Sequence, residues 1–436
     1  MKPEKTYPAS RALASGLLAF AAIATSMSIN AANVPLYWDT DSAPGIQSGN
    51  GTWNTSNTNW STASDGSSVP GPWVVGSSGN RSNAYFGGGA AGDYTVTLGF
   101  DAVVNFIQQT AGTSNYTLTG RQITLGNAGG LRVNSGVFVV ESTLIAGANL
   151  NMNLSAATGT TLVLAGDNTL STTVQIGNGS NLDGTVKLAN ANALGGVSTV
   201  NMNTNSSGQT LDINGYTLNG KNITSASGKN FRLISSSTTS DAEWAGNISI
   251  GAGTTLTAGA TGAGKTLEIS GEISGATGNL TTLANSHLIL SGTSTYSGAT
   301  TIAAGSTFEL AATGFILFNL NAGKDGIVNV MTGTGTAILD GTFTLSFNLA
   351  DVAEGASLAF LASDISATYG SSFTLRALDA TLTKVAGAQN LWAGGGWIYD
   401  MGTGVFSRGV IPEPATTIAL LGGAAILAAS VLRRRK

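Results

Sequence analysis

The sequence predicts an all-β chain: a right-handed parallel β-helix (solenoid) with β caps at both ends, plus an N-terminal signal and a C-terminal transmembrane helix. Glycine accounts for 60 of 436 residues, about twice its usual share, and charged residues are only 10%. Short alternating apolar stretches recur between turn-forming residues, and no stretch between residues 34 and 410 shows a persuasive helical period. Apolar runs flanked by basic residues occur at the two ends.

The composition argues against disorder and against nucleic-acid binding. Hydrophobic residues make up 42% of the chain and the net charge is −4, which does not suit an unfolded segment. The terminal segments hold 7 of the 19 basic and 2 of the 23 acidic residues, so the body has 12 basic and 21 acidic residues, a net charge of −9. A body this acidic gains nothing from phosphate contacts, so no nucleic-acid partner is expected. The absence of cysteine removes thiol nucleophiles and cysteine-based metal sites.

Residues 1–32 have the pattern of a secretory signal peptide. Three basic residues precede an apolar stretch from Ala12 to Ile29, and a run of small residues follows. Cleavage is expected after Ala32, with Ser26 as the other position. The alternative is an N-terminal membrane anchor, which the serine, threonine and glycine residues of the stretch make less hydrophobic than usual.

Residues 33–93 are predicted to form a tryptophan-rich N-terminal cap. This segment holds four of the seven tryptophans, Trp38, Trp53, Trp60 and Trp73. The first coil of a solenoid has an open end, and large apolar side chains are suited to covering it. The alternative is that Trp53 and Trp60 stack on sugars.

Residues 94–314 are predicted to form the solenoid of β-strand repeats. Tyr94, Val96 and Leu98 alternate with threonines and therefore share one strand face. Asn-Gly pairs such as Asn214-Gly215 separate such stretches and favour tight turns. The predicted strands are residues 94–98, 116–118, 123–125, 137–140, 162–164, 174–176, 186–188, 211–213, 248–250, 267–269 and 288–290.

Two segments of the body resemble the autotransporter-associated β-strand repeat. Residues 162–196 carry Leu-Ala-Gly-Asp-Asn-Thr early and Leu-Ala-Asn-Ala-Asn-Ala-Leu-Gly-Gly late, and residues 288–310 carry Ser-Gly before Tyr-Ser-Gly. The tryptophan segment resembles the opening segment that precedes such repeats. The resemblance implies a passenger-like parallel β-helix, in which each coil buries its inward residues against its neighbours.

Residues 315–409 are predicted to form a C-terminal β cap. The segment has longer strand candidates at residues 342–349 and 373–378. It closes with a group of aromatic residues, which are Trp392, Trp397, Tyr399 and Phe406.

Residues 410–436 form a three-part tail. Pro412, Glu413 and Pro414 come first, residues 415–432 are mostly apolar, and a basic cluster of Arg433, Arg434, Arg435 and Lys436 follows. At about 1.5 Å per residue, an apolar helix of this length spans roughly 27 Å, enough to cross the core of a membrane. The basic cluster predicts a cytoplasmic stop and an external body.

This order of elements resembles the PEP-CTERM sorting signal of Gram-negative bacteria, with Pro412, Glu413 and Pro414 as its motif. The resemblance covers the last 25 or so residues and implies an exosortase-type membrane protease as a partner. It also implies an inner-membrane intermediate followed by transfer to the cell surface or release. The alternative is a plain single-span anchor.

Three short motifs match catalytic or ligand-binding patterns without the context that the chemistry needs. Residues 259–266 satisfy the phosphate-loop pattern, but an alternating strand pattern follows where a helix is required. His287, the single histidine, has no serine elbow beside it in the sequence. Residues 88–93 approximate one calcium-binding repeat, but such sites need stacked copies. No catalytic residue, cofactor site or metal site is therefore predicted.

Polysaccharide lyases and hydrolases built on β-helices are the enzyme alternative. Such enzymes need carboxylates on one face of adjacent coils. A coil of 29 residues would align Asp183, Asp212 and Asp241, and Lys187 and Arg232 are the basic residues nearest to them.

The sequence therefore predicts a non-enzymatic, exported cell-surface or extracellular-matrix protein with a structural or adhesive role. Exopolysaccharide or another surface component is the expected external partner, and the membrane is contacted through residues 415–432. The alternative is a surface polysaccharide-binding or polysaccharide-degrading β-helix protein. A self-secreting autotransporter is disfavoured, because the region after the repeats is shorter than a translocator domain.

Overall fold

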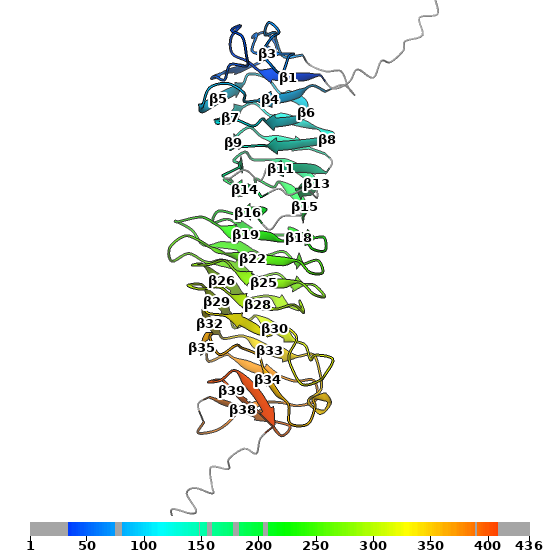
Figure 1. Ribbon diagram of the computed structural model, residues 1–436, viewed down its shortest axis with the longest axis vertical. Helices are drawn as coiled ribbons and strands as arrows, with labels where there is room; N and C mark the ends of the chain where they lie inside the picture. Colours follow the sequence, from blue (N-terminus) through cyan, green and yellow to red (C-terminus); the bar gives the residue numbers. More distant parts are fainter. Residues whose placement is uncertain are drawn as a thin grey trace, which may run out of the picture.

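The computed structural model describes residues 34–74, 81–147, 149–154, 159–177, 183–203, 208–388 and 390–408. These residues form an all-β parallel solenoid of the right-handed type, with coils stacked along one long axis (Figure 1). One short 3-10 turn, η1 (Leu349–Asp351), is the only helical element in the described ranges. The predicted all-β solenoid is confirmed.

The strands form three ladders along the solenoid axis and one sheet at the C-terminal end. Pairing within the ladders is parallel apart from that of β1 (Pro35–Trp38) with β3 (Trp60–Ser61). One antiparallel bridge, between β22 (Thr255–Ala260) and β26 (His287–Leu290), joins the second ladder to the third. The first ladder contains, in spatial order, β3 (Trp60–Ser61), β1 (Pro35–Trp38), β4 (Asn83–Phe86), β6 (Ala102–Gln109), β8 (Ile123–Val133), β10 (Leu144–Ala146), β13 (Thr169–Ile176), β15 (Gly196–Met202), β18 (Asn222–Ser225), β21 (Ile248–Ser249), β24 (Ile273–Ser274), β27 (Thr293–Ser294), β30 (Phe315–Phe318), β33 (Thr342–Leu345) and β36 (Thr374–Arg376). The strand β11 (Leu150–Leu154) follows β10 in the same coil and also pairs with β8 and β13.

The second ladder contains β2 (Gly51–Trp53), β5 (Gly92–Leu98), β7 (Ser114–Gly120), β9 (Val137–Val140), β12 (Thr161–Leu164), β14 (Thr185–Leu188), β16 (Thr210–Asp212), β19 (Phe231–Ser235), β22 (Thr255–Ala260), β25 (Asn279–Thr282), β28 (Thr300–Ile302) and β31 (Met331–Gly333). The third ladder contains β17 (Thr217–Leu218), β20 (Ala242–Trp244), β23 (Leu267–Ile269), β26 (His287–Leu290), β29 (Thr307–Leu310), β32 (Thr336–Leu339) and β35 (Ser366–Tyr369). From β16 onward each coil therefore has three sides.

The core is a column of inward side chains that runs the length of the described chain. Leu162, Val186, Leu211 and Leu233 occupy matched positions in four successive coils, and each is fully buried. Burying one such side chain stabilises the fold by about 1.5–3 kcal/mol. Because the inward residues of each coil are covered by the coils above and below it, the alternating sequence pattern forms a continuous core.

Asparagine and aspartate side chains join successive coils at the corners. The Oδ1 atom of Asn222 accepts the amide of Asn247, and Oδ1 of Asn247 accepts the amide of Glu272, each 25 residues further on. The predicted turn at Asn214 and Gly215 is confirmed, because both residues have positive φ angles, 49° and 83°. Short polar turns therefore serve both chain reversal and contact between coils.

Parallel pairing extends beyond residues 94–314 at both ends. It begins within residues 33–93 with β1 on β4, and β2 of that segment pairs with β5. It continues beyond residue 314 through β30, β33 and β36. An antiparallel end sheet lies beyond the last coil (Figure 1). It contains β34 (Ser357–Ala359), β40 (Val405–Arg408), β39 (Trp397–Asp400), β38 (Leu391–Gly394) and β37 (Thr383–Lys384).

The two terminal segments lie outside the described residues. These are the predicted signal, residues 1–32, and the predicted sorting segment, residues 410–436, with its apolar run at residues 415–432. Within the part of the chain that the structure describes, no helix has the length and apolar character needed to span a membrane.

Candidate functional site

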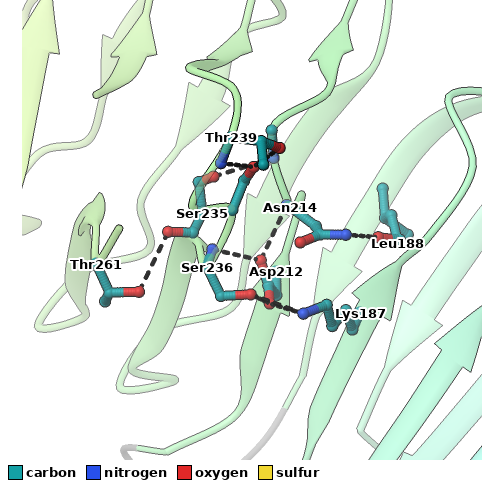
Figure 2. Close-up of polar contacts among 10 residues, drawn as sticks. Lys187, Leu188, Asp212, Asn214, Ser235, Ser236, Thr239 and Thr261 are labelled. Atoms are coloured by element: carbon teal, nitrogen blue, oxygen red, sulfur yellow. Dashed lines mark hydrogen bonds and ion pairs between the residues drawn. The ribbon is translucent and has the colours of Figure 1, made fainter. Parts of the chain in front are cut away.

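A polar cavity of 360 Å³ lies beside the second ladder, where residues of three successive coils meet (Figure 2). It is lined by Lys187, Asn214, Gly215, Tyr216 and residues 236–240. Lys187 lies on β14, and the parallel register places it beside Asp212 of β16. Ser236 follows β19 directly, in the next coil. The site is therefore assembled by the stacking of coils.

The carboxylate of Asp212 is the centre of the hydrogen-bond network. Its side chain is only 4% exposed, and Oδ1 accepts the amides of Asn214 at 2.9 Å and Ser236 at 3.0 Å. Its Oδ2 atom accepts the hydroxyl of Ser236 at 2.5 Å. The Lys187 Nζ atom lies 3.8 Å from that oxygen and donates to Ser236 Oγ at 2.8 Å. The buried charge is thus paired and hydrogen-bonded, as a stable interior requires.

The hydroxyl of Ser236 is hydrogen-bonded to both of its charged neighbours. Here Ser236 Oγ accepts a hydrogen bond from Lys187 and directs its own proton to Asp212. The three side chains therefore form a charged network that connects successive coils.

The loops around the cavity present hydroxyl and amide groups. The amide of Gly215 donates to Ser235 Oγ at 3.0 Å, and the Asn214 side chain donates to the carbonyl of Leu188 at 3.0 Å (Figure 2). Ser237 Oγ accepts the amide of Ser240 at 3.0 Å. A cavity with a partly exposed ammonium and many hydroxyls is chemically suited to a polyhydroxylated or anionic ligand.

The structure does not align the three aspartates of the predicted carboxylate row. The 29-residue coil that the enzyme alternative would need does not occur in this region, because contacts between coils recur at 25 residues. Asp183 accepts the amide of Gly208 at 2.9 Å, and Asp241 accepts that of Thr266 at 2.8 Å. The bond from Thr266 holds the pKa of Asp241 below its usual range. Of the three, Asp212 contacts the lining of the polar cavity through Asn214 and Ser236, whereas the other two carboxylates cap neighbouring coils.

The phosphate-loop pattern does not form a phosphate-binding loop. Residues 259–266 span the end of β22 and the turn that leads to β23, so a strand follows the loop instead of a helix. The N-terminal amides of a helix, which hold the phosphates in such loops, are therefore missing at this position.

His287 is paired with a carboxylate of the next coil. Its Nε2 atom lies 3.1 Å from Oε2 of Glu309, and both side chains are 30% exposed. In the segment of residues 88–93, residues 88–91 form a bend, and Gly92 and Asp93 begin β5. Among the described residues there is no group of three or more histidines and carboxylates placed to hold a metal ion.

The tryptophans near the N-terminus are part of the core. Trp38, Trp53 and Trp60 are at most 1% exposed and Trp73 is 3% exposed. Trp53 packs edge-to-face against Trp60 and Trp73, with ring centroids 5.0 and 4.7 Å apart. Because sugars stack on exposed ring faces, the alternative role for Trp53 and Trp60 in sugar binding does not fit their positions.

Sequence reasoning identified part of the polar site and missed the rest. It noted Asp212, Lys187 and the turn at Asn214, but it assigned no role to Ser236 or Tyr216. These residues lie in different coils, and their meeting depends on a coil length that the sequence pattern does not specify. The predicted sorting residues, Pro412, Glu413 and Pro414 with the basic cluster at residues 433–436, lie outside the described residues.

The fold and the site define a solenoid protein with a polar cavity of a size that could hold a ligand. Comparison with known proteins gives a local similarity. Over 158 residues the chain is 36% identical to the adhesin BmaC autotransporter of Brucella suis biovar 1 (strain 1330). The aligned segment covers 36% of this chain and 4% of that relative. No family model matches the chain, and no solved structure matches it.

Proposed function

We propose that this chain is an exported cell-surface or extracellular-matrix protein with a structural and adhesive role. The observation that carries the proposal is the local similarity to an autotransporter adhesin, found on a chain whose described part is a parallel solenoid. A solenoid of this kind offers long polar faces to a partner while its core remains covered by stacked coils. The signal pattern of residues 1–32 supports export.

Delivery to the surface is proposed to depend on the C-terminal tail. Pro412, Glu413 and Pro414 are the recognition motif for an exosortase-type protease, and residues 415–432 hold the chain in the inner membrane before processing. Arg433, Arg434, Arg435 and Lys436 act as the cytoplasmic stop. The resemblance of this three-part order to the PEP-CTERM signal supports this step.

No catalytic activity is proposed. The position of Asp212, buried and hydrogen-bonded to Ser236 and two amides, supports a structural role for this carboxylate, which holds two residues of the cavity lining in place. A second candidate function is binding of a surface polysaccharide, favoured by the hydroxyl-rich lining of that cavity.

The test compares cells that produce the full chain with cells that lack it, on immobilised glycans and matrix proteins. Adhesion is expected to rise with the full chain and to be blocked by the purified protein. If cells with and without the chain attached equally well to every surface, the proposed adhesive role would be contradicted. Release of new reducing ends from a polysaccharide by purified protein would instead establish the enzyme alternative.

A further inference from the structure

The third ladder ends in a strand with one unpaired edge. β35 pairs with β32, and the amides of Ser366 and Gly370 donate to Gly335 and Leu339 of the preceding coil. Because backbone groups alternate along a strand, the N–H and C=O groups of Ala367 and Tyr369 point to the opposite side. Among the described residues, no strand pairs with β35 on that side.

A groove runs along this edge. Two adjoining cavities, of 580 and 290 Å³, share Ala367, Tyr369, Met401 and Gly402 in their linings. The turn between β39 and β40 lies opposite the strand. The larger cavity also reaches Lys384 and Trp392 on the β37–β38 hairpin, whereas the smaller continues to Leu361 at the start of the last coil.

Two other strand edges are covered by the chain itself, one in the end sheet and one at the N-terminal end of the second ladder. β40 pairs with β34, and this contact ends where Phe360 donates to the carbonyl of Gly404 at 3.0 Å. At the N-terminal end of the second ladder, the carbonyl of Thr52 accepts the side-chain amides of Asn57 and Asn59. Proteins protect exposed strand edges because they pair readily with other chains. The edge of β35 lacks this protection.

The lining of the groove indicates the chemistry of its occupant. Lys384 is exposed and is the one charged residue among those that line the two cavities. Tyr369 and Trp392 contribute aromatic surface, and Tyr369 is held in place by a 2.8 Å hydrogen bond between its hydroxyl and that of Tyr399. A carboxylate near Lys384 would complete the local charge pairing.

We propose that the edge of β35 binds an extended acidic peptide, which adds a strand to the third ladder. The backbone groups of Ala367 and Tyr369 would pair with alternate residues of the peptide, and Lys384 would pair with its carboxylate. Donors and acceptors that repeat every second residue along a strand match another peptide backbone better than they match a polysaccharide. This inference goes beyond the adhesive role and does not depend on it.

The test measures binding of a fluorescent octapeptide of alternating threonine and glutamate to the full chain by polarisation. Saturable binding is expected, and N-methylation of alternate peptide amides should weaken it by at least about tenfold because the added ladder cannot form. A threonine–lysine octapeptide should bind similarly weakly. These arms need no protein variant, so they do not depend on whether a variant folds.

Two substitutions locate the binding to this groove. Ala367→Pro removes an outward amide while leaving the bonds from Ser366 and Gly370 to the preceding coil, so it should abolish binding without lowering the melting temperature appreciably. Lys384→Gln should weaken binding by roughly tenfold and make it less sensitive to salt. Equal binding of the N-methylated peptide, or competition by an oligouronate but by no peptide, would overturn the proposal.

Discussion

At the scale of single residues, Asp212 is a tightly constrained charged group beside the polar cavity. It accepts three hydrogen bonds from Asn214 and Ser236 and is nearly inaccessible to solvent. Asp212→Ala leaves two amides and Lys187 without this partner and should lower the free energy of unfolding by about 2–3 kcal/mol. Equilibrium urea unfolding measures the change.

Asp183→Ala is the matched control for this prediction. Asp183 is exposed, and among the described residues its recorded hydrogen bond is with the amide of Gly208. Its removal should change the free energy of unfolding by no more than about 0.5 kcal/mol. Equal losses in the two variants would contradict the assignment of Asp212 as the organising residue of the network.

Tyr369 connects the last coil to the end sheet. Its burial predicts that the stability of the fold decreases at alkaline pH. Burial raises the pKa of Tyr369 to about 12, whereas an unfolded tyrosine titrates near 10. Below pH 10 both states are protonated, so stability does not depend on this group. Between about pH 10 and 12 only the unfolded state loses the proton, so stability falls as the pH rises.

The measurement is an ultraviolet titration of tyrosinate in the folded chain, together with unfolding at several alkaline pH values. Tyr369→Phe removes one late-titrating phenol and should reduce the alkaline loss of stability. Tyr399, whose pKa is also raised by burial, continues to contribute in that variant. If Tyr369 ionised near pH 10 in the folded protein, the predicted dependence would be absent.

At the scale of strands and turns, glycines allow adjacent coils to approach closely at one corner. A Cβ atom on Gly246 would overlap the carbonyl of Lys221, one on Gly271 would overlap that of Gly246, and one on Gly292 would overlap that of Gly271. The glycines therefore form a column in successive coils, where any side chain would push the coils apart.

Gly271→Ala is expected to destabilise the chain by about 1–3 kcal/mol, since the overlap involves backbone that cannot move alone. Gly71→Ala is the control, because a Cβ there meets no atom within 4 Å and its φ angle is not in the left-handed region. Thermal unfolding followed by circular dichroism compares the two. A Gly271 variant as stable as the wild type would show that the coils can separate at this corner without cost.

At the scale of the whole molecule, the tail is expected to determine where the protein is found. If Pro412, Glu413 and Pro414 are a processing site, mature surface protein should lack residues 415–436. Replacing Pro412 and Pro414 with alanine should leave unprocessed chain in the inner membrane, and mass spectrometry of each cell fraction identifies the C-terminus. Surface protein that still ends at Lys436 would leave a simple membrane anchor as the explanation.

Local pattern was sufficient to predict strands and turns but not the site. Residues 94–98 and 288–290 form strands with the predicted alternation because side-chain direction along a strand depends only on neighbouring residues. Lys187, Asp212 and Ser236 are separated by 25 and 24 residues, and no local rule relates them. The 29-residue period considered for the enzyme alternative therefore does not bring the three carboxylates together.

The sequence by itself determined the β character of the chain, the alternation that builds its core, and the Asn-Gly turn at residues 214–215. Only the tertiary structure decided that the N-terminal tryptophans are interior, that Asp212 meets Lys187 and Ser236, and that β35 keeps an unpaired edge. The physical reason is register. Strand formation follows from neighbouring residues, whereas the contacts between coils depend on the length of every turn, and a change of one residue reverses the face to which each side chain points.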